Sequence, residues 1–339
     1  MRLNLKPLHQ QVIFITGATS GIGLATLHRA VEQGAKVFFT SRNEEELQRL
    51  QDKMRGEGYE TAYAVADVAE PDQIQVAVDA CIHTFGRIDT FVNNAGISVY
   101  SKLLDTSMDE ARRLFDTNFW GVVNGCKAAV PVMREKGGVI INIGSVLSNV
   151  AIPIQGLYSA SKHAVKAYTD SLRREIISDK FPIQVTLIMP SAIDTPYTEH
   201  ARSHIGEPVH QSPVYSADVV AKAILRCAVK PTRELGVGIG AFLFPLLDRL
   251  APNLADRFMA KSFSEDKQST DKQLSEREHG NAGNLFLTPA SEGKTSGNYP
   301  GHVMKSSLYT EISERKGIFK AAAIAGGFAL LFFRRLRVL

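Results

Sequence analysis

Short apolar runs alternate with longer amphipathic segments along the first two thirds of the chain. The short runs are rich in β-branched and aromatic residues, which favour strands. The longer segments repeat apolar residues at three- and four-residue intervals, which is the spacing of one helix face. We predict strands at 12–16, 36–40, 61–67, 88–94, 138–144 and 183–189, and helices that include 24–33, 44–55, 73–85 and 160–178.

This alternation predicts an α/β fold. Strands that alternate with helices form crossover units, and a series of such units builds a Rossmann-type doubly wound parallel sheet with helices on both faces. The predicted strands are continuous apolar runs, as strands covered on both faces require. We expect one domain over residues 1–262, with a further packed helix at 240–259, followed by a C-terminal extension.

The extension has two parts of different composition. Residues 263–316 are rich in Ser, Gly, Asn and charged side chains, which predicts a polar linker or a loosely folded extension. Residues 317–339 hold an uncharged run of 13 residues, 321–333, followed by Arg334, Arg335 and Arg337. With 317–320 added, this segment would span roughly 26 Å as a helix, near the lower limit for crossing a membrane.

The hydrophobic and basic C-terminal segment has two interpretations. It is either a membrane anchor or a terminal helix that packs on its own domain or on a sister subunit. We favour the anchor, because three arginines at the end of an apolar run are typical of a segment whose basic flank meets anionic lipid.

The composition restricts the classes of partner and the cellular compartment that the protein can have. The chain has 339 residues, 44% of them hydrophobic, and a formal charge of only +4 spread along its length, which indicates no nucleic acid partner. The three cysteines form no CxxC pair, which fits a reducing compartment, and the amino terminus lacks the apolar core of a signal peptide. We expect a cytoplasmic homo-oligomer that contacts membranes through its C-terminal segment.

The stretch TGATSGIG, residues 16–23, lies where the first predicted strand passes into a helix. Gly17, Gly21 and Gly23 would let the backbone approach a pyrophosphate that faces the helix N-terminus. The alternative is a tight turn without a ligand, since the spacing differs from GxGxxG. Its position after the first strand of an alternating fold favours the dinucleotide site.

The end of the second predicted strand indicates which dinucleotide binds. NAD-binding folds carry an acidic residue there, whereas an arginine accommodates the 2′-phosphate of NADP. This chain has Ser41 and Arg42 at that corner and no carboxylate before Glu44, so we expect NADP rather than NAD. The alternative is that Arg42 is a solvated residue at the start of the next helix.

Several further motifs follow in a fixed order. They are Asp67-Val68 after the third strand, NNAG at 93–96 after the fourth, Asn118, Ser145 after the fifth, and YSASK at 158–162. With TGATSGIG they make residues 8–240 resemble the short-chain dehydrogenase/reductase family. The segment GNLF at 283–286 resembles segments of extended members of that family, and we have no mechanism for it from the sequence.

The resemblance implies a set of cofactor contacts. One departure is visible, since the family has Pro-Gly after the sixth strand where this chain has Pro190-Ser191. The implied cofactor-binding residues are Gly17, Thr19, Ser20, Gly21, Ile22, Gly23, Ser41, Arg42, Asp67, Val68, Asn93, Asn94, Gly96, Tyr158, Lys162 and Thr195.

Tyr158 and Lys162 are four residues apart, so both lie on one face of the predicted helix. Reduction of a ketone needs an acid within hydrogen-bond reach of the carbonyl oxygen, and Tyr158 would be that acid. A phenol titrates near about 10, and the Lys162 ammonium would lower this pKa. Ser145 would polarise the substrate carbonyl. The resemblance implies that Asn118 positions Lys162 through a water.

The substrate implied is a small alcohol, ketone or aldehyde, and an apolar one. Met189, Tyr197 and the predicted helix 217–229 either shape its pocket or belong to the core. No metal site is expected, because His200, His204 and His210 have no fixed ligand spacing. Two other functions stay open: a non-catalytic redox sensor or scaffold that binds a dinucleotide, and an epimerase or dehydratase on a related fold.

Overall fold

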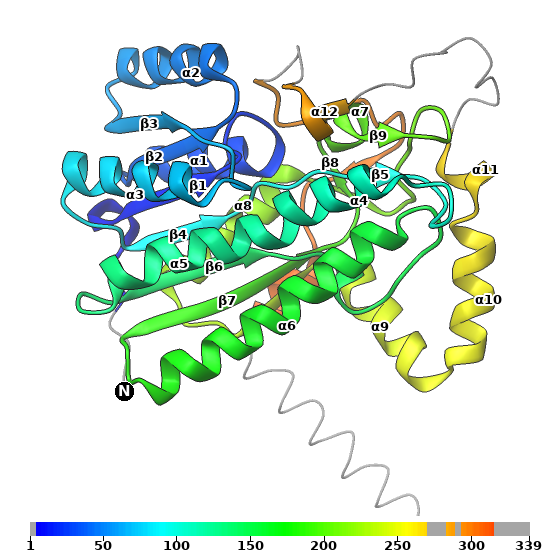
Figure 1. Ribbon diagram of the computed structural model, residues 1–339. Helices are drawn as coiled ribbons and strands as arrows, with labels where there is room; N and C mark the ends of the chain where they lie inside the picture. Colours follow the sequence, from blue (N-terminus) through cyan, green and yellow to red (C-terminus); the bar gives the residue numbers. More distant parts are fainter. Residues whose placement is uncertain (1–4, 270–282, 289–292, 315–339) are drawn as a thin grey trace, which may run out of the picture.

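A parallel β-sheet forms the centre of the molecule (Figure 1). The computed structural model describes residues 5–269, 283–288 and 293–314. Within these residues, the central sheet has seven strands in the order β11-β7-β6-β4-β1-β2-β3. The six predicted strands are present, and β11 is an additional one. The bounds are β1 Val12–Thr16, β2 Lys36–Ser41, β3 Thr61–Val65, β4 Thr90–Asn93, β6 Gly138–Ile143, β7 Ile183–Pro190 and β11 Glu234–Val237.

Helices cover both faces of the sheet, as the pattern predicts. On one face, α1 (Gly21–Glu32), α2 (Glu44–Gly56) and α8 (Ala217–Val229) contribute buried leucines, valines and isoleucines to the core. On the other, α3 (Pro71–Phe85), α5 (Gly121–Met133) and α6 (Gly156–Ser178) do the same. The strand order reverses at β1. The strands that follow it directly, β2 and β3, lie on one side of β1, and the later strands, beginning with β4, lie on the other side. Ligands of such sheets bind outside the carboxyl ends of the strands at this switch point.

Short elements surround that carboxyl edge (Figure 1). Two longer helices, α9 (Gly240–Leu250) and α10 (Pro252–Ser262), form an arm beside it and correspond to the predicted helix at 240–259. The remaining elements of the domain are η1 Leu8–Gln10, β5 Val99–Tyr100, α4 Met108–Phe115, the π-helical turn η2 Asp116–Trp120, η3 Val146–Ser148, β8 Ile193–Asp194, α7 Tyr197–His200, β9 Arg202–Ser203 and β10 Val214–Ser216.

The described parts of the extension pack on the domain. They contain α11 (Glu265–Gln268), α12 (Gly283–Phe286), β12 (Val303–Met304) and α13 (Leu308–Glu314). Strand β12 pairs in parallel with β10, and α13 contacts β11. The polar composition predicts a linker, but a few buried groups hold these parts in place. For example, the buried Gln268 amide donates to the carbonyl oxygens of Pro153 and Phe263.

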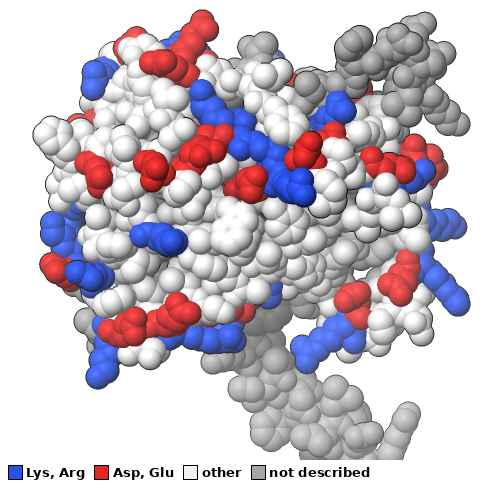
Figure 2. Space-filling model, viewed as in Figure 1, with Lys and Arg blue, Asp and Glu red and all other residues white. Residues whose placement is uncertain are grey.

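Charged side chains of both signs are interspersed over the face shown in Figure 2. Among the helices that the structure describes, none has the length and apolar character needed to cross a membrane. The predicted anchor at 317–339 lies outside the described residues.

Candidate active site

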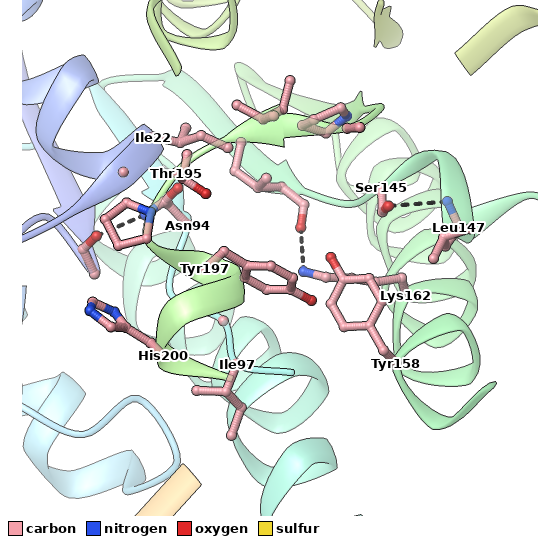
Figure 3. Close-up of a pocket in the computed structure, with 18 of the residues that line it drawn as sticks. Ile22, Asn94, Ile97, Ser145, Leu147, Tyr158, Lys162, Thr195, Tyr197 and His200 are labelled. Atoms are coloured by element: carbon pink, nitrogen blue, oxygen red, sulfur yellow. Dashed lines mark hydrogen bonds between the residues drawn. The ribbon is translucent and has the colours of Figure 1, made fainter. Parts of the chain in front are cut away.

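A pocket with a volume of about 300 Å³ runs along the carboxyl edge of the sheet. One end is formed by the glycine-rich turn after β1, and the other by residues of η3, α6 and α7 (Figure 3). The structure thus brings most of the predicted site residues together. Those that line the pocket are Gly17, Thr19, Ser20, Gly21, Ile22, Ser41, Arg42, Asp67, Val68, Asn94, Gly96, Ser145, Tyr158, Lys162 and Thr195.

The glycine-rich turn is held tightly against the following strands. Gly17 has a φ of +65°, and a Cβ there would lie 2.8 Å from the Cα of Ala95. No larger residue fits this position. The Asn94 amide donates to the carbonyl oxygen of Gly17 at 2.9 Å and so fixes the turn. Gly23 does not line the pocket, because it packs beneath the turn, where a Cβ would collide with the Gly17 carbonyl oxygen.

Arg42 lines the end of the pocket near β2, and Arg113 bonds to groups beside it. The Arg42 guanidinium donates to the carbonyl oxygens of Asn284, at 2.6 Å, and Leu287, at 3.3 Å. Arg113 of α4 pairs with the Asp67 carboxylate. Asn284 and Leu287 both belong to the extension. Asn284 lines the pocket, where sequence reasoning did not place it, and the GNLF motif at 283–286 was the signal that could have found it.

Besides Gly23, two predicted residues lie outside the pocket lining. The Asn93 amide points into the core, where it donates to Asn142 Oδ1 at 2.8 Å, because consecutive strand residues face opposite sides of a sheet. Asn118 lies in the π-helical turn η2, a type of distortion frequent at functional sites. Its amide donates to Ile97 O at 3.0 Å and accepts from Ile97 N at 2.9 Å. Asn118 therefore holds the loop after β4 that passes beside Lys162.

Tyr158 and Lys162 lie one turn apart on α6 and face the pocket (Figure 3). The Lys162 ammonium donates to the carbonyl oxygen of Ile143 at 2.9 Å and lies 5.7 Å from the centroid of the Tyr158 ring. Ser145 follows β6, and its hydroxyl caps η3 by accepting from Leu147 N at 3.1 Å. The ring of Tyr197 meets that of Tyr158 edge to face at 5.7 Å. These contacts hold the reactive side chains in one arrangement.

Burial dominates the electrostatics of this end of the pocket. It lowers the pKa of Lys162 to about 8. It raises the pKa of Tyr158 above the ordinary value, and the nearby hydroxyls of Tyr197 and Ser145 oppose part of this increase. At neutral pH the pair is therefore a neutral phenol beside an ammonium, which is the state suited to proton donation.

The pocket wall beside Tyr158 is largely apolar. It includes Val146, Leu147, Ile152, Phe244 and Phe263. Of the residues expected either to shape the substrate pocket or to belong to the core, some do one and some the other. Tyr197 lines the pocket, whereas Met189 and α8 lie in the core on the two faces of the sheet. His200 and His210 line the pocket, and His204 binds Glu110.

Ser191 fits where the family has glycine. Its φ is not positive, so a side chain causes no backbone strain there, and its N–H donates to Val237 O at 2.8 Å. Thr195 lies over the glycine-rich turn, with its Cβ 3.1 Å from where a Cβ of Gly21 would lie.

Comparisons with known proteins show the family to which the chain belongs. The model of the family described as short chain dehydrogenase matches residues 11–206. The chain is 39% identical to the "Uncharacterized oxidoreductase YxnA" of Bacillus subtilis, over 99% of this chain and 94% of that protein. It is also 39% identical to the 3-ketodihydrosphingosine reductase of Bacteroides thetaiotaomicron, over 57% of this chain and 68% of that one.

A solved structure shares the fold. It is an alcohol dehydrogenase from the archaeon Thermococcus sibiricus complexed with 5-hydroxy-NADP. The two superimpose with a TM-score of 0.60 and 24% identity, over 67% of this chain and 95% of that one. Together with the motif order and the pocket, these matches identify the chain as a member of the short-chain dehydrogenase/reductase family, oxidoreductases that act on CH–OH groups with a nicotinamide dinucleotide.

Proposed function

We propose that the protein is an NADP(H)-dependent oxidoreductase that interconverts an alcohol with a ketone or aldehyde. One observation carries the proposal. Ser145, Tyr158 and Lys162 meet at one end of a pocket whose other end is the glycine-rich turn. A dinucleotide sensor or scaffold has no use for a proton donor at that place, so the triad favours an enzyme.

The residues present fit a dinucleotide. The positive φ of Gly17 and Gly21 and the absence of a Cβ at both leave a cradle against the first turn of α1, where N–H groups favour phosphate. Arg42 would hold the 2′-phosphate of NADP, since it is the cation at the end of β2. Lys162 and Thr195 would contact the nicotinamide half. The bound nicotinamide would supply or accept the hydride.

The side chains of α6 and η3 would handle the proton. Tyr158 donates its hydroxyl proton to the substrate oxygen during reduction and takes it back during oxidation. Lys162 favours the phenolate by its positive charge, and Ser145 hydrogen-bonds the substrate oxygen as charge develops on it. Asn118 is a positioning residue that holds the backbone at Ile97.

An apolar ketone is the substrate class that the pocket supports. Its wall of aliphatic and aromatic side chains beside Tyr158 offers burial to a hydrocarbon group. The relative from Bacteroides thetaiotaomicron is named for a ketone substrate. Assay of the purified protein against panels of apolar ketones, aldehydes and alcohols, followed by NADPH absorbance, tests the proposal. Absence of turnover across the panels, with dinucleotide binding intact, would favour the sensor.

The rate of ketone reduction is expected to fall as the pH rises past about 8. Burial lowers the pKa of Lys162 to about 8, so its ammonium is present below that pH and is lost above it. Activity that needs this positive charge is therefore lost as the pH rises. Measuring kcat/KM between about pH 6 and pH 10 checks this, since that ratio reports groups of the free enzyme. Lys162→Arg keeps its charge throughout and should remove the inflection; a wild-type profile that rises above pH 8 contradicts the assignment.

Membrane association through the C-terminal segment remains part of the proposal. Several large apolar side chains of the α9–α10 arm are exposed, including Leu250, which is 73% exposed. Tyr309 of α13, near the end of the described residues, contacts Phe242 of that arm, with ring centroids 5.6 Å apart. The full-length protein is expected to sediment with membranes, and a version ending at Glu314 to remain active in the supernatant. Membrane fractionation of both versions at high salt tests this prediction. A full-length protein found wholly in the supernatant refutes the anchor.

A further inference from the structure

The outer wall of the cofactor pocket comes from the C-terminal extension. We call residues 283–288 and 293–297 the strap. Asn284 and Thr288 of the strap line the same pocket as the glycine-rich turn and Arg42. In sequence these residues lie more than two hundred positions beyond the turn that they face.

The first part of the strap is anchored by one leucine and two arginines. The Leu285 side chain is fully buried among Ile97, Val99 and Leu114. The main-chain oxygens at the end of α12 accept from both arginines, with the Arg113 guanidinium 2.9 Å from the Leu285 oxygen. Cations at the end of a helix stabilise its unpaired carbonyl groups in this way.

The second part of the strap lies against the glycine-rich turn. Gly293 N–H donates to Thr19 O at 2.9 Å, and Gly21 N–H donates to Lys294 O at 2.9 Å. Gly297 N–H then donates to Asp194 Oδ1 at 3.1 Å, beside Thr195. The strap therefore contacts the segments that would hold both the phosphates and the nicotinamide half of a dinucleotide.

We propose that the strap is part of the cofactor site and retains the dinucleotide: the cofactor lies beneath it and dissociates only after the strap detaches. This rests on the proposed function. The strap is bonded to Arg42, Thr19 and Gly21, so its detachment opens the adenosine side of the pocket. In the part of the strap that the structure describes, Leu285 is the buried apolar side chain, and most other contacts are hydrogen bonds and close backbone packing. A segment with so little buried apolar surface can open locally while the domain stays folded. Opening of such a segment commonly limits ligand release.

The experiment measures how fast NADPH and NADH leave the full-length protein, by stopped-flow displacement followed through cofactor fluorescence. Leu285→Ala should accelerate the release of both by about tenfold or more, because loss of a buried leucine weakens the closed state. The factor should be similar for the two cofactors, since the strap's bonds to Thr19 and Gly21 lie at a part of the proposed site that both cofactors share. Leu308→Ala is the matched control, because Leu308 is in the extension but is 72% exposed; its rates should equal those of the wild type.

A second variant guards against misfolding of the first. A Cβ at Gly297 would lie 2.5 Å from the Thr195 carbonyl oxygen, so Gly297→Val should push the strap away without opening a cavity. It should likewise accelerate release of both dinucleotides. If both variants bind the cofactors and release them at the wild-type rate, the strap proposal is overturned and the proposed function stands. If the wild type binds neither dinucleotide, the proposed function itself fails, and the strap proposal with it.

Discussion

Replacing Tyr158 with phenylalanine is expected to lower kcat for ketone reduction by about 10²-fold or more while affinity for NADPH changes little. The ring of Tyr158 packs edge to face on Tyr197 and lies beside the Lys162 ammonium, and phenylalanine keeps both contacts. What the variant loses is the hydroxyl that we propose as the proton donor. Steady-state rates together with a fluorescence titration of NADPH separate loss of chemistry from loss of binding.

Tyr197→Phe serves as the control for this experiment. It removes a neighbouring hydroxyl that lowers the pKa of Tyr158 but leaves the proton donor in place. A smaller loss of kcat is expected, since the reaction keeps its acid. Wild-type turnover by the Tyr158→Phe variant would show that another group donates the proton.

Replacing Arg42 with alanine is expected to weaken NADPH binding by about 10²-fold and NADH binding far less, because NADH binding loses only some of the bonds that anchor the strap, whereas NADPH binding also loses the partner of its 2′-phosphate. In the proposed function the guanidinium would pair with a phosphate that NADP alone carries, so its removal should discriminate between the two cofactors. Leu285→Ala should instead affect both cofactors alike, which separates the role of Arg42 from that of the strap. Equilibrium titrations of each variant with both cofactors measure the ratio of the NADPH and NADH dissociation constants.

A nearby arginine provides the control for the Arg42 substitution. Arg55 lies in the last turn of α2, is exposed and does not line the pocket, so Arg55→Ala removes the same charge from the same region. Both affinities should stay within about twofold of the wild type, because exposed charges contribute little. A wild-type protein that binds NADH more tightly than NADPH would refute the assignment of Arg42 to the 2′-phosphate.

The layout of the sheet could be predicted because its strands are continuous apolar runs with strong local preferences. All six predicted strands are present, with ends that differ by a few residues. Strand β11 was not predicted, because its sequence ELGV is short and leads into a glycine-rich stretch that resembles a loop. Its pairing with β7 supplies the preference that its own residues lack.

The sequence by itself determined the family, the glycine-rich turn and the pairing of Tyr158 with Lys162. Each of these depends on residues close together in the chain, where spacing alone sets which face or turn they occupy. The place of Asn94 in the pocket and of Asn93 in the core was left to the tertiary structure. These neighbours at the end of β4 look equivalent in sequence, and the packing of α5 and β6 decides which amide is buried.

Tertiary structure also decided where the strap lies and how Lys162 ionises. Arg42 and Leu287 meet across 245 residues of chain, and no local pattern records such a contact. The polar composition around Leu285 hides its burial, because one apolar side chain suffices to dock a short segment when main-chain hydrogen bonds hold the rest. The lowered pKa of Lys162 likewise arises from desolvation. Burial of that kind exists only once distant segments have enclosed the side chain.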